Sequence, residues 1–139
     1  MQTSNYLANL LKQAAAGGAA VEFPASYFIR RYSANPTASG MGGTEVSGGG
    51  YAPVEYENIP ANWQNEAGGW RSNTEIIQYD EATGSQGNST HFALWDAASG
   101  GNMLFFAPFL DEDGDPATVA VAANQKMTFA AGALRIRAI

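Results

Sequence analysis

The chain has 139 residues, of which 45% are hydrophobic and 14% charged, and its formal net charge is -6. This length suits one domain with a modest core. The seven lysines and arginines are spread thinly, without the basic patch that indicates nucleic-acid binding. Because the sequence contains no cysteine, disulfides, thiolate metal sites and cysteine nucleophiles are excluded.

Residues 1–16 predict a short amphipathic helix. Thr3 or Ser4 can cap its N-terminus, and the glycines at 17–18 end it. Apolar side chains recur at helical spacing, namely Tyr6, Leu7, Leu10, Leu11 and Ala14. A helix this short is marginal alone in water, so its apolar side needs either the protein's own body or another subunit. No stretch resembles a signal peptide or a membrane span, and we expect a product made in the cytoplasm.

After a small-residue connector the sequence has the signals of short β-strands separated by Gly, Asn and Asp turns. The predicted strands cover residues 26–33, 51–59, 74–81, 91–96, 103–110, 117–123, 126–131 and 133–139. Pro53 favours an edge strand or the start of a strand, and strand alternation places Arg30 and Arg31 on opposite faces. We therefore predict a mainly β protein, an antiparallel β-sandwich of jelly-roll type over residues 21–139, preceded by a helical arm and connector at 1–20.

Two segments lack strand signals. Residues 33–50 are rich in glycine and almost free of bulky apolar side chains, which predicts an exposed loop. Residues 60–73 form a second irregular region that carries Trp63 and Trp70. These tryptophans either cap the core or form an exposed contact for assembly or for a glycan.

The stretch THFALWDAASGGNMLFFAPFL, residues 90–110, contains the single histidine. Gly100, Gly101 and Asn102 tolerate the positive φ of a hairpin turn, so the segment predicts two paired strands. His91 then begins the first strand as a structural residue. The sequence shows no nucleophile and base arranged around it, and one histidine without cysteine does not make a transition-metal site.

Acidic residues offer two weaker candidate sites. Asp111, Asp113 and Asp115 match the first ligand positions of a calcium loop, but Pro116 and Ala122 replace the required glycine and glutamate. An acidic turn is therefore the preferred interpretation of residues 111–116, with weak calcium binding as the alternative. Glu55 and Glu57 share a strand face, which indicates a solvated edge more than a glycosidase pair.

Four stretches carry a family resemblance: SNYLANLLKQAAAGG, GGTEVSGGGYAPV, THFALWDAASGGNMLFF and FAAGALRI. They resemble a family of small structural proteins of tailed bacteriophages, often labelled tail-fibre-like or head-fibre proteins, and the resemblance covers nearly the whole chain. The chain departs from the family pattern at NIPANWQNEAGGWRSN and at DEDGDP, where we expect its surface contacts to differ.

The resemblance implies a virion component without enzymatic activity or cofactor. We expect a capsid decoration or cement protein that binds the major capsid protein or other virion subunits, with a tail-fibre or receptor-binding subunit as the alternative. The expected partner contacts are Tyr6, Leu7, Leu10 and Leu11 on the arm, with Trp63 and Trp70 on the loop. We expect a homo-oligomer, for which a trimer would suit capsid three-fold positions, and no nucleic-acid or membrane partner. A sandwich lectin or carbohydrate-active enzyme using Glu55, Glu57 or Asp113 is the third hypothesis.

Overall fold

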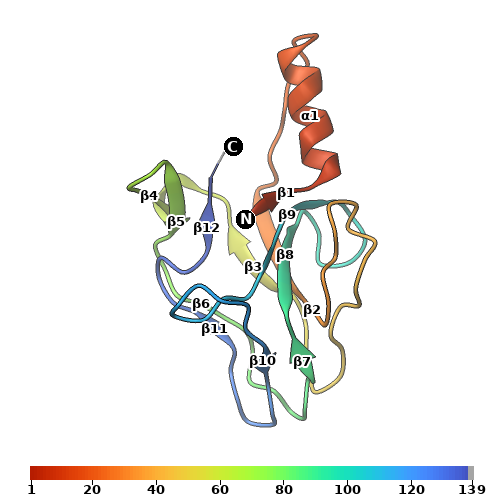
Figure 1. Ribbon diagram of the computed structural model, residues 1–139, viewed down its shortest axis with the longest axis vertical. Coiled ribbons are helices and arrows are strands. Elements are labelled where there is room, and N and C mark those ends of the chain that lie inside the picture. The colour runs from red at the N-terminus through yellow and green to blue at the C-terminus, as the bar shows by residue number, and fades with distance from the viewer. Residues whose placement is uncertain (138–139) are drawn as a thin grey trace.

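The computed structural model describes residues 1–137 and is mainly β, with one α-helix standing away from the body (Figure 1). The helix is α1 (Asn5–Ala15), and a 3-10 turn, η1, covers Pro60–Asn62. The strands are β1 (Gln2–Thr3), β2 (Ser26–Tyr32), β3 (Val54–Glu57), β4 (Trp63–Glu66), β5 (Trp70–Asn73), β6 (Ile77–Gln78), β7 (Asn88–Ser89), β8 (His91–Trp95), β9 (Met103–Pro108), β10 (Val119–Ala120), β11 (Thr128–Phe129) and β12 (Arg135–Ile136). Every strand pair is antiparallel, which confirms the predicted fold class.

The central sheet has five strands in the order β1-β9-β8-β2-β3. The predicted hairpin of β8 and β9 is confirmed, and Gly100 and Gly101 adopt positive φ values of 63° and 73° in its turn. The Asp96 carboxylate closes this turn by accepting the backbone N–H of Asn102 at 2.7 Å. Strand β3 lies at the sheet edge, as Pro53 predicts.

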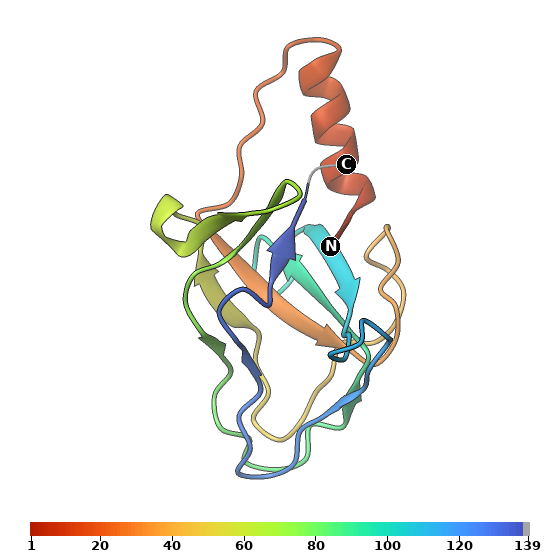
Figure 2. The ribbon, with the colours of Figure 1, turned by 60° about the vertical axis from the view of Figure 1, so that its left-hand side comes forward.

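The second layer is a set of short pairs, β6 with β11 and β7 with β10, together with the three-stranded sheet β12-β5-β4 (Figure 2). The core lies between these pairs and one face of the central sheet. Its largest members from the central sheet are Tyr27, Ile29, Tyr56, Phe92, Leu94 and Phe105, and those from the other layer are Trp63, Ile77, Phe129 and Leu134. The arrangement is sandwich-like and does not close into a barrel.

Strand β2 separates the adjacent arginines as predicted, one on each face. Arg31 is buried on the core side, where its guanidinium carbon lies 5.0 and 4.8 Å from the ring centroids of Tyr51 and Tyr79. Arg30 lies on the opposite face, over Trp95. Both cations are buried in the body, so neither contributes to the outer charge pattern.

Residues 60–73 are more regular than the sequence predicts. They form η1 and then a hairpin of β4 and β5 whose turn uses Gly68 and Gly69 at φ values of 80° and 78°. The strands predicted at 74–81, 117–123 and 126–131 are shorter than expected, since β6, β10 and β11 have two residues each. Strand β7, which pairs with β10, was not predicted. At eleven residues α1 is far too short to span a bilayer, and residues 1–137 hold no longer helix.

Candidate attachment surface

The arm, residues 4–25, consists of α1 and the extended segment that returns from its tip to β2. Figures 1 and 2 both show it projecting beyond the β body, with the helix and the returning segment side by side. At about 1.5 Å of rise a residue, the eleven residues of α1 reach about 16 Å. At the tip, Gly18 takes a φ of 68°, and Ala19 N–H donates to the Gln13 carbonyl at 3.3 Å. The arm is therefore a projecting finger, made of a helix and an extended segment that a glycine turn joins.

The foot of the arm, where α1 begins, is fixed to the β body. Ser4 caps the helix as predicted, its hydroxyl accepting the backbone N–H of Leu7 at 3.1 Å. The Ser4 N–H donates to the Leu104 carbonyl at 2.9 Å, and β1 pairs with β9 just before it. Leu7 is only 2% exposed and belongs to the main core. Of the predicted contact residues, Leu7 therefore anchors the arm to its own body.

Both segments of the arm carry large apolar side chains that are exposed. Tyr6 is 40% exposed and Leu11 46%, while Leu10 and Ala14 are half-buried. On the returning segment Phe23 is 47% exposed. Three large apolar side chains on one projecting finger form the type of surface that a protein partner covers.

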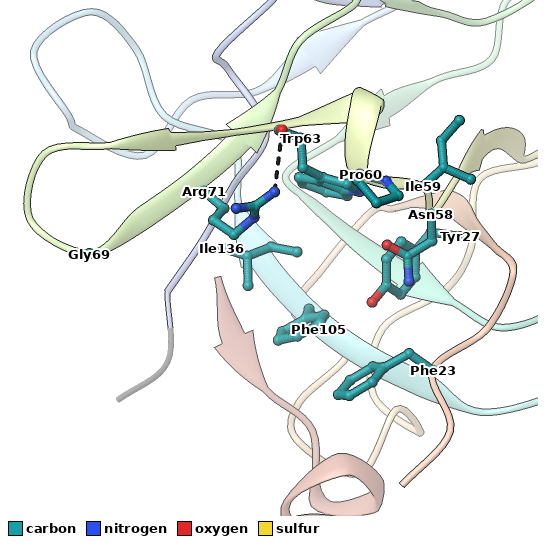
Figure 3. A pocket seen from close by; sticks show the side chains of 10 residues that line it. All are labelled: Phe23, Tyr27, Asn58, Ile59, Pro60, Trp63, Gly69, Arg71, Phe105 and Ile136. Carbon is teal, nitrogen blue, oxygen red and sulfur yellow. Dashed lines mark hydrogen bonds between the residues drawn. The ribbon is translucent and has the colours of Figure 1, made fainter.

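A groove of about 570 Å³ lies at the foot of the arm (Figure 3). Its walls come from the arm, the central sheet and the three-stranded sheet, and its lining includes Phe23, Tyr27, Trp63, Phe105 and Ile136. Burial raises the pKa of Tyr27 to about 12, so this hydroxyl stays protonated over the physiological range. The groove extends the apolar surface of the arm onto the body.

The two tryptophans of the β4–β5 hairpin have different surroundings. Trp63 is buried, and its ring makes edge contacts with Tyr27 and Tyr56 at centroid distances of 6.2 and 5.6 Å. Trp70 is half-buried on the opposite side of the hairpin, beneath the guanidinium groups of Arg135 and Arg137. The sequence placed both tryptophans together on a loop, whereas the structure leaves Trp70 alone at the surface.

His91 begins β8 as predicted, and its Nδ1 lies 2.8 Å from the Thr90 hydroxyl. Partial burial lowers the pKa of its imidazole, which favours the neutral ring. In the 111–116 turn, one Asp111 oxygen accepts the N–H groups of Asp113 and Asp115, each at 2.9 Å. Among residues 1–137 no group of three or more acidic or histidine side chains is placed to hold a metal ion.

A comparison with known families adds one finding to this geometry. The family model described as podophage GP4 fiber I protein gp80 matches residues 2–137. No curated protein sequence matches the chain. The match covers the arm and the β body together.

Proposed function

The chain belongs to the podophage GP4 fiber I protein gp80 family, and we propose that it is a non-enzymatic fibre subunit that attaches to the phage particle through its arm. The family makes it a structural component of a phage virion. Its description favours a fibre over the capsid decoration protein that the sequence first suggests. Both roles need a stable body and a contact that reaches another subunit.

The exposed apolar face of the arm is the observation that carries this proposal. Tyr6, Leu11 and Phe23 are exposed on a finger whose foot is fixed by Leu7 and which projects beyond the β body (Figure 1). Covering a leucine or an aromatic side chain contributes about 1.5–3 kcal/mol. A groove on another virion subunit that takes this finger would therefore hold the protein firmly.

Point substitutions test the role of the arm better than truncation does. Removing residues 1–16 would also remove β1 and Leu7, which belong to the body. The double change Tyr6→Gln and Leu11→Gln keeps the helix-forming character of both positions and removes only exposed apolar surface. Lys12→Gln, on the same helix, is the matched control.

The experiment adds each purified protein to particles that lack it and measures bound protein after sedimentation of the particles. The double variant should bind roughly a hundredfold more weakly, because about 3 kcal/mol of apolar contact is lost. Lys12→Gln should bind as the unchanged protein does. Equal binding by the double variant would refute attachment through the arm.

Immunogold labelling of intact particles separates the two structural roles. Label confined to the tail or neck supports the fibre subunit. Label scattered over the head supports decoration, with the same arm inserted into the major capsid protein. The location thus tests the role on the virion independently of the arm substitutions.

A further inference from the structure

Exposed positive charge gathers on the sheet β12-β5-β4 of this acidic protein. Three of the seven lysines and arginines belong to this sheet or directly follow it, namely Arg71, Arg135 and Arg137. Pairing of β12 with β5 places Arg135 opposite Ser72. Because side chains alternate along a strand, Arg135 and Arg137 share one face of the sheet with Trp70, and Arg71 lies on the other face. We call the face with Trp70 the basic face.

On the basic face two cations stack on one indole ring. The guanidinium carbons of Arg135 and Arg137 lie 4.8 and 4.5 Å from the ring centroid of Trp70. Glu66 pairs with Arg135 at 2.9 Å, and this is the only ion pair within residues 1–137. Two guanidinium groups and one carboxylate leave one net positive charge, which the contact with the indole holds in place.

An apolar groove of about 510 Å³ begins at the basic face, and its volume is typical of sites that bind small molecules. Among its lining side chains only Trp70, Thr128 and Arg135 carry a nitrogen or oxygen atom. The other side chains are aliphatic or aromatic, and they include the half-buried Val119 and Met127. The groove therefore offers a large apolar surface with few hydrogen-bonding side chains.

The two ends of the groove are set by strand β9. The Met1 amino group donates to the Arg135 carbonyl at 3.3 Å, and β1 pairs with β9 in the register of Gln2 opposite Phe106. Residues 107–110 follow Phe106 and line the groove as far as Leu110. Arg135 therefore lies near the start of this run, and Leu110, which is 57% exposed, lies at its end.

From this arrangement we infer that the groove binds a fatty acid. The carboxylate lies at Arg135 and Arg137, where the net positive charge matches a single anionic head group. The hydrocarbon chain runs along the groove toward Leu110. The exposed carboxylates of residues 111–115 follow Leu110 and repel a carboxylate at that end, so the ligand binds in one direction.

The lining favours a hydrocarbon chain over other ligand classes. The hydroxyl groups of a sugar and the amide groups of a peptide need hydrogen-bond partners when they leave water, and this groove has few polar side chains to supply them. A hydrocarbon chain needs none, and it removes Leu110, Val119 and Met127 from water. The unbranched side chain of Met127 can adapt to the shape of the ligand.

Calorimetric titration of the whole protein with hexanoate, octanoate and decanoate tests the inference. Each added methylene that the groove covers should tighten binding by up to about fourfold. The uncharged 1-octanol has the chain of octanoate without its charge, so it reports on the apolar groove alone. The titrations use the isolated protein and do not depend on attachment through the arm.

Arg137→Gln separates the head group from the chain. The variant should bind octanoate roughly tenfold more weakly, because a charge-assisted hydrogen bond is lost, and it should bind 1-octanol as the unchanged protein does. Arg71→Gln is the matched control. Arg71 is the exposed arginine on the other face of the same sheet, where it lines the groove at the foot of the arm. This variant should bind both ligands normally.

Leu110→Gln tests the far end of the chain. Its side chain is mostly exposed, so the substitution should leave the fold unchanged. The gain in affinity from octanoate to decanoate should shrink in this variant, because the added methylenes no longer cover an apolar side chain. In Arg137→Gln that gain should keep its full size.

The inference is overturned if decanoate shows no saturable binding, or if Arg137→Gln leaves octanoate binding unchanged or weakens 1-octanol equally. It is also overturned if Arg71→Gln weakens octanoate as much as Arg137→Gln does, because the ligand would then occupy the groove at the foot of the arm. Circular dichroism of each variant establishes that it is folded, so that lost binding is not lost structure.

Discussion

The guanidinium of Arg30 stacks over the ring of Trp95, with 3.9 Å between the guanidinium carbon and the ring centroid. Its Nη2 donates to the carbonyls of Ala97 and Gly100, at 2.7 and 2.6 Å. Arg30 therefore reaches across from β2 to hold the turn that joins β8 to β9. This contact therefore stabilises the glycine-containing turn at that end of the central sheet.

Arg30→Lys should lower the free energy of unfolding by about 1–2 kcal/mol, because an ammonium group cannot stack and donate to two carbonyls as the planar guanidinium does. Urea denaturation measures the change. Arg71→Lys, at an exposed position of β5, is the control and should cost less. Equal losses from the two variants would show that the turn does not depend on Arg30.

Gly49 is predicted to resist substitution. Its φ is 56°, and an added Cβ would lie 2.3 Å from the carbonyl oxygen of Gly84. Gly49→Ala should cost about 3 kcal/mol, since the backbone must move in addition to the strain of a positive φ. Gly48→Ala has a φ of 79° and its nearest neighbour 3.9 Å away, so it should cost only about 1 kcal/mol. Thermal unfolding of both variants checks the difference, and similar melting temperatures would contradict it.

Gly49 also shows how the long loop, residues 33–50, is held to the body. The Gly49 carbonyl accepts Thr83 N–H at 2.9 Å and the Gln86 side-chain amide at 3.0 Å. Gln86 in turn accepts a hydrogen bond from the buried Arg31. Residues 33–50 are correctly predicted to lack a regular strand, but their attachment to Arg31 follows from contacts between distant parts of the chain that periodicity cannot show.

Local pattern predicted the elements with strong alternation or spacing, which are α1, β2, and the hairpin of β8 with β9. It missed the hairpin of β4 with β5 because its outer positions, such as Gln64 and Glu66, are polar and hydrogen-bond to Ser72 instead of packing. Only the glycines at 68 and 69 signalled its turn. Polar pairing of this type leaves no apolar alternation for a sequence analysis to detect.

Contacts at the candidate surfaces were predictable only in part. Leu7 and Leu11 are four residues apart and share one side of α1, yet one is buried and the other exposed. Helical spacing identifies that side but not the point at which the body ends. Likewise, Trp70 meets Arg135 through strand pairing between residues far apart in the sequence, which composition does not reveal.

Alkaline pH should destabilise the protein through its buried tyrosines. Burial raises the pKa of Tyr27 from its ordinary value of 10 to about 12, and burial also raises the pKa of Tyr51 and Tyr79. The folded state therefore keeps protons that the unfolded state releases, so this stabilisation is complete below pH 10 and is lost as the pH rises toward 12.

For one such tyrosine the free energy of unfolding falls by about 1.4 kcal/mol per pH unit in that window. Tyr27→Phe keeps the ring that contacts Trp63 and Phe105. It should reduce the dependence of the unfolding free energy on pH by the contribution of one proton, about 1.4 kcal/mol per pH unit. Urea denaturation at several pH values between 9 and 12 measures the slope, with Tyr6→Phe on the exposed arm as the control. An unchanged slope in Tyr27→Phe would contradict the assignment.

The stability of the protein and its attachment to the particle should depend on different residues of α1. Leu7→Ala removes a core side chain and should lower the free energy of unfolding by about 2–4 kcal/mol, whereas Leu11→Ala removes exposed surface and should change it by less than about 0.5 kcal/mol. In binding to particles the order reverses: Leu11→Ala should weaken attachment at temperatures where it is fully folded, while folded Leu7→Ala keeps the contact side chains Tyr6 and Leu11. Because both variants make the same chemical change four residues apart on one helix, each is the control for the other. If Leu11→Ala lost stability as Leu7→Ala does, the outer turns of α1 would be part of the core, and the arm would have no free face to offer a partner.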